Sequence, residues 1–140
     1  MPTSNATATW EGSLKDGKGA MTPAHGPEVP FSLGTRFEGK TGSNPEEMIG
    51  AALAGCFSMA LSAGLAREGT APKRIRTTAA VTIEKQPEGF TITHIALSTE
   101  AEIPGYDAAK FQKLADETKK GCPVSKALSA VKIDLSAKLL

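Results

Sequence analysis

The chain has 140 residues, 40% of them hydrophobic and 22% charged, with a formal net charge of +1. This length and composition predict a single globular domain over residues 1–140, whose core needs neither disulfides nor a metal. Basic residues form no stripe that would neutralise phosphates, so we expect no nucleic acid partner. Met1–Trp10 lacks the basic and apolar regions of a signal peptide, and we therefore expect a cytoplasmic protein.

The N-terminal part predicts a β-hairpin followed by irregular chain. Two extended segments, Thr7–Trp10 and Lys18–Met21, flank the tight-turn pair Asp16-Gly17. The next segment, Thr22–Pro30, holds three prolines and predicts a loop. We expect Phe31–Phe37 to be a short extended piece.

A long helix is predicted from the sequence Asn44-Pro45-Glu46-Glu47. Asparagine caps helices, proline suits the first position, and acidic groups favour the positive end of the helix dipole. The helix should end near Glu68, because Gly69 follows. Met48–Ala66 has no charged residue and approaches the length of a membrane span. Its many Ala, Gly and Ser residues instead favour a helix buried on all sides in a protein that does not enter a membrane.

The C-terminal half predicts a second hairpin, two helices and a last strand. Apolar residues alternate over Ile75–Ile83 and again over Phe90–Leu97, where a change of parity predicts a bulge near Thr93-His94. Three further elements follow: a helix capped by Asp107, a short helix from Cys122-Pro123, and a strand over Val131–Leu139. The elements together predict an α+β fold with antiparallel sheets and a long central buried helix.

The two cysteines lie in different settings. Cys56 falls in the apolar helix, where it is either a small packed side chain or a nucleophile. Burial raises a thiol pKa, so reactivity at Cys56 needs a positive charge from elsewhere. Cys122 begins a helix, where backbone amides favour a thiolate, although a plain capping role fits the same position.

Several functions remain open from the residues alone. A hydrolase would pair Cys56 with His25 or His94, but neither histidine belongs to a recognisable nucleophile motif. The two cysteines and two histidines could in principle form a zinc site, but no pair of them has the spacing of zinc ligands. A dimeric binding or stress protein with incidental thiols is the non-enzymatic alternative.

Four segments resemble one known family. They are TWEGSLKDGKG, TRFEG, NPEEMIGAALAGCFSMALS and KKGCPVSKAL, which begin at residues 9, 35, 44 and 119. They are similar to the osmotically inducible protein C (OsmC) family, a sister group of the organic hydroperoxide resistance (Ohr) proteins. The resemblance implies an intertwined homodimer and a thiol-dependent peroxidase of organic hydroperoxides and hydrogen peroxide.

The resemblance also implies roles for four residues: Cys56 as the peroxidatic cysteine, Cys122 as the resolving cysteine, and Arg36 with Glu46 beside them. A guanidinium favours the thiolate and donates to the departing oxygen, and a carboxylate orients it. Taken alone, Arg36 is a solvated strand residue and Glu46 a helix-start charge, and Glu47 is an alternative to Glu46. The implied reductant is an external dithiol, of the lipoyl type, with no cofactor or metal.

Two further expectations concern geometry. Phe31, Met48, Phe57 and Met59 are candidates for the lining of a peroxide pocket. Glu46 and Cys56 are ten residues apart, or about 15 Å along a helix, which is too far for one side chain to span. Either the helix breaks at Gly50 or Gly55, or Glu46 and Arg36 come from a second copy of the chain. We expect the second arrangement, in an obligate homodimer.

Overall fold

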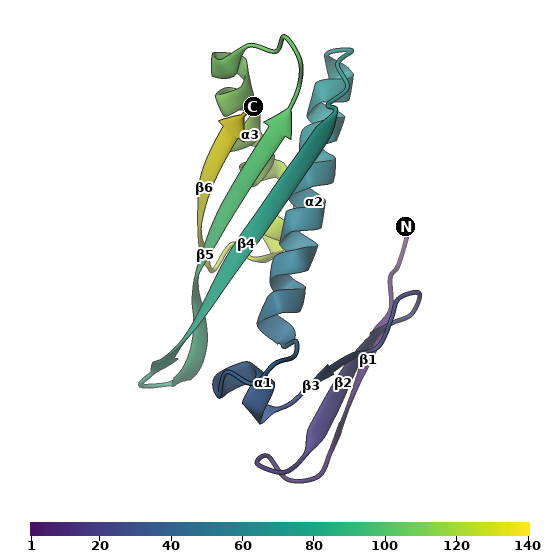
Figure 1. The fold of residues 1–140 in the computed structure, drawn as a ribbon, viewed down its shortest axis with the longest axis vertical. Coiled ribbons are helices and arrows are strands. Elements are labelled where there is room, and N and C mark those ends of the chain that lie inside the picture. The colour runs from purple at the N-terminus through teal and green to yellow at the C-terminus, as the bar shows by residue number, and fades with distance from the viewer. The chain divides into compact units, whose positions relative to one another are not determined.

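The computed structural model describes residues 1–140 and divides into two compact units, Met1–Met48 and Ile49–Leu140 (Figure 1). Each unit contains its own three-stranded β-sheet. The four residues singled out by the sequence are divided between the units. Arg36 and Glu46 belong to the first, and Cys56 and Cys122 to the second.

The sheet of the first unit is antiparallel. It consists of β1 (Ala6–Glu11), β2 (Lys18–Pro23) and β3 (Val29–Phe31) in that order. The predicted hairpin is confirmed, but the predicted loop over Thr22–Pro30 was too long, because Pro30 pairs with Ala20 inside β3. Proline is tolerated there because β3 is an edge strand and its missing amide interrupts no central ladder.

The predicted extended piece over Phe31–Phe37 was also wrong. Leu33–Phe37 forms the short helix α1, which carries Arg36 in its last turn. The helix begins with a capping box, since Ser32 Oγ accepts from the Thr35 amide and Thr35 Oγ1 accepts from the Ser32 amide. This reciprocal pair satisfies two backbone donors and outweighs the β propensity of the flanking aromatic residues.

The first unit buries almost no apolar surface. Its only buried residues are Gly19, Gly34 and Glu46, and β1 is exposed along its whole length. The rings of Trp10 and Phe31 lie 5.7 Å apart, and both pass so close to Gly19 that a Cβ there would clash with them. A three-stranded sheet needs a packed face for independent stability, so this unit requires a surface to cover it.

The long helix α2 (Pro45–Arg67) confirms the predicted start and end. The Glu47 amide donates to Asn44 Oδ1 at the first turn. Gly69, at φ +75°, ends the helix by donating to the Ala66 carbonyl. The left-handed conformation at this position favours glycine.

The second sheet has the order β4 (Arg74–Gln86), β5 (Gly89–Glu102) and β6 (Lys132–Leu139). The predicted bulge is confirmed: Thr82 pairs with His94 and Ile83 with Ile92, which leaves Thr93 as the extra residue. The expectation of purely antiparallel sheets was wrong for β6, which runs parallel to β5. The crossover through α3 (Ala108–Gly121) and α4 (Pro123–Ala127) allows this direction.

Helices α2 and α3 cover one face of the second sheet (Figure 1). The core between them comprises Leu53, Phe57, Leu61 and Leu65 of α2, Ile95, Leu97 and Ala101 of β5, and Phe111 and Ala115 of α3. The i, i+4 spacing of the four α2 residues places them on a single stripe. By length and composition α2 could cross a membrane, but this stripe makes it a core helix of the fold.

Helix α2 is not buried on all sides within one chain, which corrects the expectation from its composition. Its opposite face is exposed and carries Ala51, Ala52, Gly55, Met59 and Ala63, with Met59 78% exposed. The sequence is apolar on every face, but a single chain provides a covering sheet for only one of them.

Phe57→Ala should lower the free energy of unfolding by about 3–5 kcal/mol, because Phe57 is fully buried at the centre of this core. Chemical denaturation monitored by circular dichroism measures the change. Leu14→Ala is the matched control, since Leu14 is 70% exposed, and should change stability by less than about 0.5 kcal/mol. Equal effects of the two substitutions would contradict the assigned core.

Candidate functional site

Two thiols are in direct contact in the second unit. Cys56 lies on α2 and Cys122 is the N-cap residue of α4, and their Sγ atoms are 2.7 Å apart and hydrogen-bonded. Both cysteines are free, with Cys122 fully buried and Cys56 partly exposed. Helix α2 brings Cys56 to this place on the face that also carries Leu53 and Phe57. The contact is close enough for a disulfide to form with only a small movement.

The two thiols differ in acidity. Burial raises the pKa of Cys56, and the hydrogen bond with Cys122 raises it further, with only the Val124 amide opposing. Burial alone would also raise the pKa of Cys122, but the Cys56 thiol, the amide and hydroxyl dipoles of Ser125 and the Val124 amide together lower it. The two thiols interact directly, so they titrate as a pair in which the local donors favour negative charge on the Cys122 side. Burial thus opposes ionisation of Cys56 within its own unit, as expected for a buried thiol without a cation.

Arg36 and Glu46 form an ion pair in the first unit. Arg36 Nη2 lies 2.6 Å from Glu46 Oε1, and Arg36 Nε lies 3.0 and 3.2 Å from the two carboxylate oxygens. The Glu46 side chain is 7% exposed and that of Arg36 34% exposed. The guanidinium also stacks on the ring of Phe37, 5.1 Å from its centroid. A buried carboxylate thus holds the guanidinium in a fixed orientation, with part of it open to solvent.

Glu47 is used differently. Its carboxylate accepts from the Ser43 hydroxyl at 2.8 Å, while its amide donates to Asn44. The structure therefore pairs Arg36 with Glu46 and gives Glu47 to the start of α2.

Helix α2 is unbroken between Glu46 and Cys56. Gly50 and Gly55 both lie within regular helix, so a break at either residue is excluded. Ten residues of α-helix place the two backbones about 15 Å apart along the axis. A glutamate side chain cannot span that length, and Glu46 therefore does not reach Cys56 on its own helix.

The histidines do not take part in the thiol pair. His94 Nε2 lies 2.7 Å from Asp134 Oδ2 on the second sheet, and His25 lies in the loop between β2 and β3. No group of three or more His, Cys, Asp or Glu residues has the arrangement of a metal site. The geometry thus supports neither the hydrolase nor the zinc alternative.

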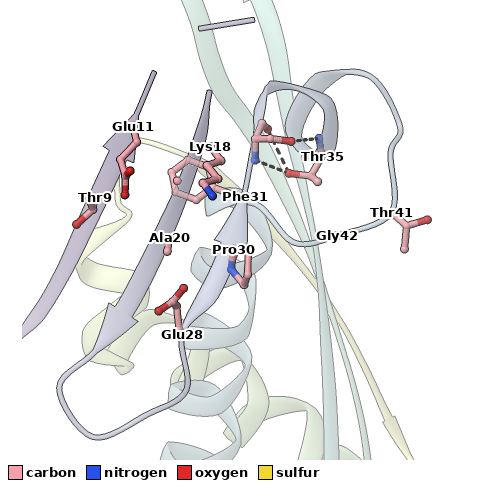
Figure 2. A pocket seen from close by; sticks show the side chains of 12 residues that line it. Thr9, Glu11, Lys18, Ala20, Glu28, Pro30, Phe31, Thr35, Thr41 and Gly42 are labelled. Carbon is pink, nitrogen blue, oxygen red and sulfur yellow. Dashed lines mark hydrogen bonds between the residues drawn. The ribbon is translucent and has the colours of Figure 1, made fainter. Parts of the chain in front are cut away.

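A hollow with a volume of about 540 Å³ lies on the sheet of the first unit (Figure 2). It is lined by polar residues such as Glu11, Lys18 and Glu28, and it contains neither cysteine. Of the four residues expected to line a peroxide pocket, only Phe31 borders this hollow. Phe57 is fully buried in the core, and Met59 lies on the exposed face of α2. We therefore do not assign this hollow as the peroxide pocket.

Two features of the site were missed by sequence reasoning. The capping box of Ser32 and Thr35 builds the helix that carries Arg36. The residues after Cys122 supply the dipoles that favour its thiolate, through Val124 and Ser125. The Cys-x-x-Ser spacing at a helix start is the signal that would have indicated the second feature, because N-cap and N3 residues face each other.

The α+β fold and the pair of contacting free thiols define a class of cysteine redox proteins. The comparisons with known proteins agree with this class. Residues 37–136 match the family model described as OsmC-like protein. The chain belongs to the OsmC-like family, which confirms the resemblance found in the sequence.

Curated relatives include both sister groups. The chain is 50% identical over 125 residues to peroxiredoxin OsmC of Escherichia coli (strain K12), covering 88% of this chain and 87% of that protein. It is 33% identical over 90 residues to the organic hydroperoxide resistance protein of Xanthomonas axonopodis pv. citri (strain 306), covering 64% and 61% of the two chains.

Solved structures confirm the fold class. The OsmC-like protein of Mycoplasma pneumoniae superposes with a TM-score of 0.80 at 16% identity, covering 99% of this chain and 98% of that chain. An organic hydroperoxide resistance protein from Elizabethkingia anophelis gives a TM-score of 0.79 at 24% identity, with coverages of 100% and 98%.

Proposed function

We propose that this chain is a thiol-dependent peroxidase that reduces organic hydroperoxides and also hydrogen peroxide. The observation that carries the proposal is the pair of free thiols, 2.7 Å apart, in a member of the OsmC-like family. A cytoplasmic location is part of the proposal, since the cycle needs a reducing compartment to return the cysteine pair to thiols.

Cys56 is the peroxidatic residue. Its thiolate attacks one peroxide oxygen, the O–O bond breaks, and the other oxygen leaves as alkoxide or hydroxide and takes up a proton. The sulfur of Cys56 becomes a sulfenic acid. Partial exposure suits Cys56 to this step, whereas Cys122 is fully buried and an alkyl peroxide could not approach it.

Cys122 is the resolving residue. Its thiolate attacks the sulfenic sulfur, forms the Cys56–Cys122 disulfide and displaces hydroxide, which leaves as water. An external dithiol, such as a protein-bound lipoyl group, then returns both cysteines to thiols by two thiol–disulfide exchanges. No step requires a prosthetic group or a metal.

A second copy of the chain supplies the positive charge that Cys56 lacks. The pKa of Cys56 is raised in its own unit, and the unbroken helix α2 keeps Glu46 away from it. The Arg36–Glu46 pair of the partner fits this need, because it offers an oriented and partly open guanidinium. It would lower the pKa of Cys56 and donate to the departing oxygen.

Burial supports the same homodimer. The first unit has no buried apolar side chain, and α2 exposes a face of small residues together with Met59. Association of two copies would cover both surfaces at once and would make the whole chain one domain of an intertwined dimer. Each of the two sites then takes Cys56 and Cys122 from one subunit, and Arg36 with Glu46 from the other.

Cys56→Ser should abolish peroxide reduction, because a hydroxyl without an adjacent base cannot replace a thiolate. Cys122→Ser should consume one equivalent of peroxide and then stall or overoxidise at Cys56. Rapid-mixing kinetics with an alkyl hydroperoxide, followed by mass spectrometry, measures both results. The unmodified protein should lose two hydrogens per chain through an intramolecular disulfide.

Full turnover by Cys56→Ser would contradict the mechanism, and normal turnover by Cys122→Ser with a dithiol would contradict the resolving role. If the unmodified protein failed to react with peroxide while both thiols remained reduced, a non-enzymatic dimeric binding or stress protein would be the better account.

Mixed dimers test the shared site. Cys56→Ser and Glu46→Ala homodimers should both be inactive, but a dimer of one chain of each should regain one complete site and about half the activity per dimer. Differently tagged chains allow the mixed dimer to be purified and assayed. Glu47→Ala is the matched control and should remain active alone, because Glu47 contacts Ser43 rather than Arg36. Inactive mixed dimers, or a monomer in sedimentation, would overturn the proposal.

A further inference from the structure

The buried hydroxyl of Ser125 has no hydrogen-bond partner in the dithiol state. Ser125 is 7% exposed, and its Oγ is the only buried side-chain oxygen or nitrogen without a partner. Leaving such a group unsatisfied costs free energy, so a native hydroxyl of this kind requires an explanation. A residue kept only for packing would be better replaced by alanine.

The position of Ser125 relative to Cys122 explains why this hydroxyl is kept. Cys122 is the N-cap residue of α4 and Ser125 is its N3 residue. In this arrangement the cap side chain normally accepts from the backbone amide of the N3 residue, so the two side chains lie on the same side of the turn. The Cys122 thiol makes no capping hydrogen bond in the dithiol state, in which it donates to Cys56 Sγ at 2.7 Å. Pro123 has no amide hydrogen, so Val124 and Ser125 supply the first donors of this turn.

Resting on the proposed peroxidase cycle, we propose that Ser125 is the hydrogen-bond donor reserved for the thiolate of Cys122. The Ser125 hydroxyl has no partner while the Cys122 thiol is protonated and hydrogen-bonded to Cys56. It donates to Cys122 Sγ when that sulfur becomes negatively charged. The buried oxygen is thus satisfied in the reactive state rather than in the resting state.

The thiolate of Cys122 occurs twice in the cycle. It attacks the Cys56 sulfenic acid, so that an S–S bond forms, the S–O bond breaks, Cys122 is oxidised and hydroxide departs. It is also the leaving group when an external thiolate attacks Cys56 in the disulfide and reduces it. A thiol of lower pKa leaves faster, so Ser125 directs the reductant to Cys56, which is also the more exposed sulfur.

Other groups beside Cys122 do not replace this donor. Arg67 of α2 and Glu117 of α3 line the small hollow that also borders Cys122. Substituting Ser125 leaves both of these charges in place, so any change in the pKa of Cys122 reports the loss of the hydroxyl. Cys56 is the remaining titratable neighbour. A hydrogen bond from the Ser125 hydroxyl is among the causes that lower the pKa of Cys122, as expected of a donor to its thiolate.

Thiol titration tests the assignment without any peroxidase activity. In a Cys56→Ser background, Ser125→Ala should raise the pKa of Cys122 by about one unit, which corresponds to the loss of one charge-assisted hydrogen bond. Ser125→Thr keeps the hydroxyl and should restore the lower pKa. Ser129→Ala, at an exposed position just after α4, is the matched control and should change nothing.

Stopped-flow kinetics separates this proposal from the proposed function. In the otherwise unmodified chain, Ser125→Ala should leave the first reaction of Cys56 with peroxide unchanged. Disulfide formation should slow about threefold near neutral pH. The variant has about tenfold less Cys122 thiolate, but a thiolate of higher pKa is a stronger nucleophile, which offsets part of the loss. The pH at which disulfide formation reaches half its maximal rate should rise. Absence of the first reaction in the unmodified chain would count against the peroxidase, while the titration still decides the role of Ser125.

Thermal stability distinguishes this role from a purely structural one, because loss of a structural hydrogen bond would lower the unfolding temperature. Ser125→Ala removes an unsatisfied buried hydroxyl, so the reduced protein should unfold at the same or a higher temperature. An unchanged Cys122 pKa in Ser125→Ala, or a clear loss of thermal stability without a pKa change, would overturn the proposal.

Discussion

The rigidity of helix α2 is the constraint on which the site depends. Ten residues of unbroken helix separate Glu46 from Cys56, which fixes their backbones about 15 Å apart along the axis. Glu46 in turn holds Arg36 through an ion pair in which the carboxylate is almost fully buried. The carboxylate that orients the cation therefore cannot lie beside the Cys56 of its own helix. The proposed homodimer would resolve the conflict, and it would also cover the surfaces that a single chain leaves open.

The two thiols differ in how many hydrogen-bond donors their own chain places beside them. Cys122 is buried, but local amides and the Ser125 hydroxyl lower its pKa. Cys56 has no comparable set of donors, and burial raises its pKa. In this account, Cys56 becomes a strong nucleophile only when a partner guanidinium is in place, so assembly and reactivity are coupled. In the proposed cycle, Cys122 owes its lowered pKa to its own chain alone, which suits a residue that must act quickly once the sulfenic acid has formed.

Local signals in the sequence predicted much of the fold. Asn44, Gly69 and Asp107 marked helix ends correctly, because caps depend on neighbouring residues alone. The change of parity around Thr93 located the bulge for the same reason. Two errors arose where a longer-range partner decided: Pro30 joined a strand because β2 was beside it, and β6 ran parallel to β5 after a helical crossover. The error at helix α1 had a local cause, because the capping box of Ser32 and Thr35 was not recognised in the sequence.

The candidate site was predictable only in part. Helix geometry alone showed that Glu46 could not reach Cys56, whereas the residue types of Arg36 and Cys122 had plausible structural roles and required a family resemblance to stand out. Ser125 was not predicted, because its significance lies in an absence of partners that only coordinates reveal. The apolar composition of α2 on every face had suggested cover from a second copy, and the exposed face of α2 in one chain is consistent with that expectation.

The pKa of Cys56 tests the central claim most directly. It is measured from thiolate absorbance as a function of pH in Cys122→Ser protein, where Cys56 is the only thiol. We predict a pKa below the ordinary thiol value of about 8.5 in the protein that retains Arg36, and a pKa above that value in Arg36→Ala. Arg36→Lys should give an intermediate value, because it keeps the charge without the planar fork. The same pKa for Cys56 with and without Arg36 would contradict the account.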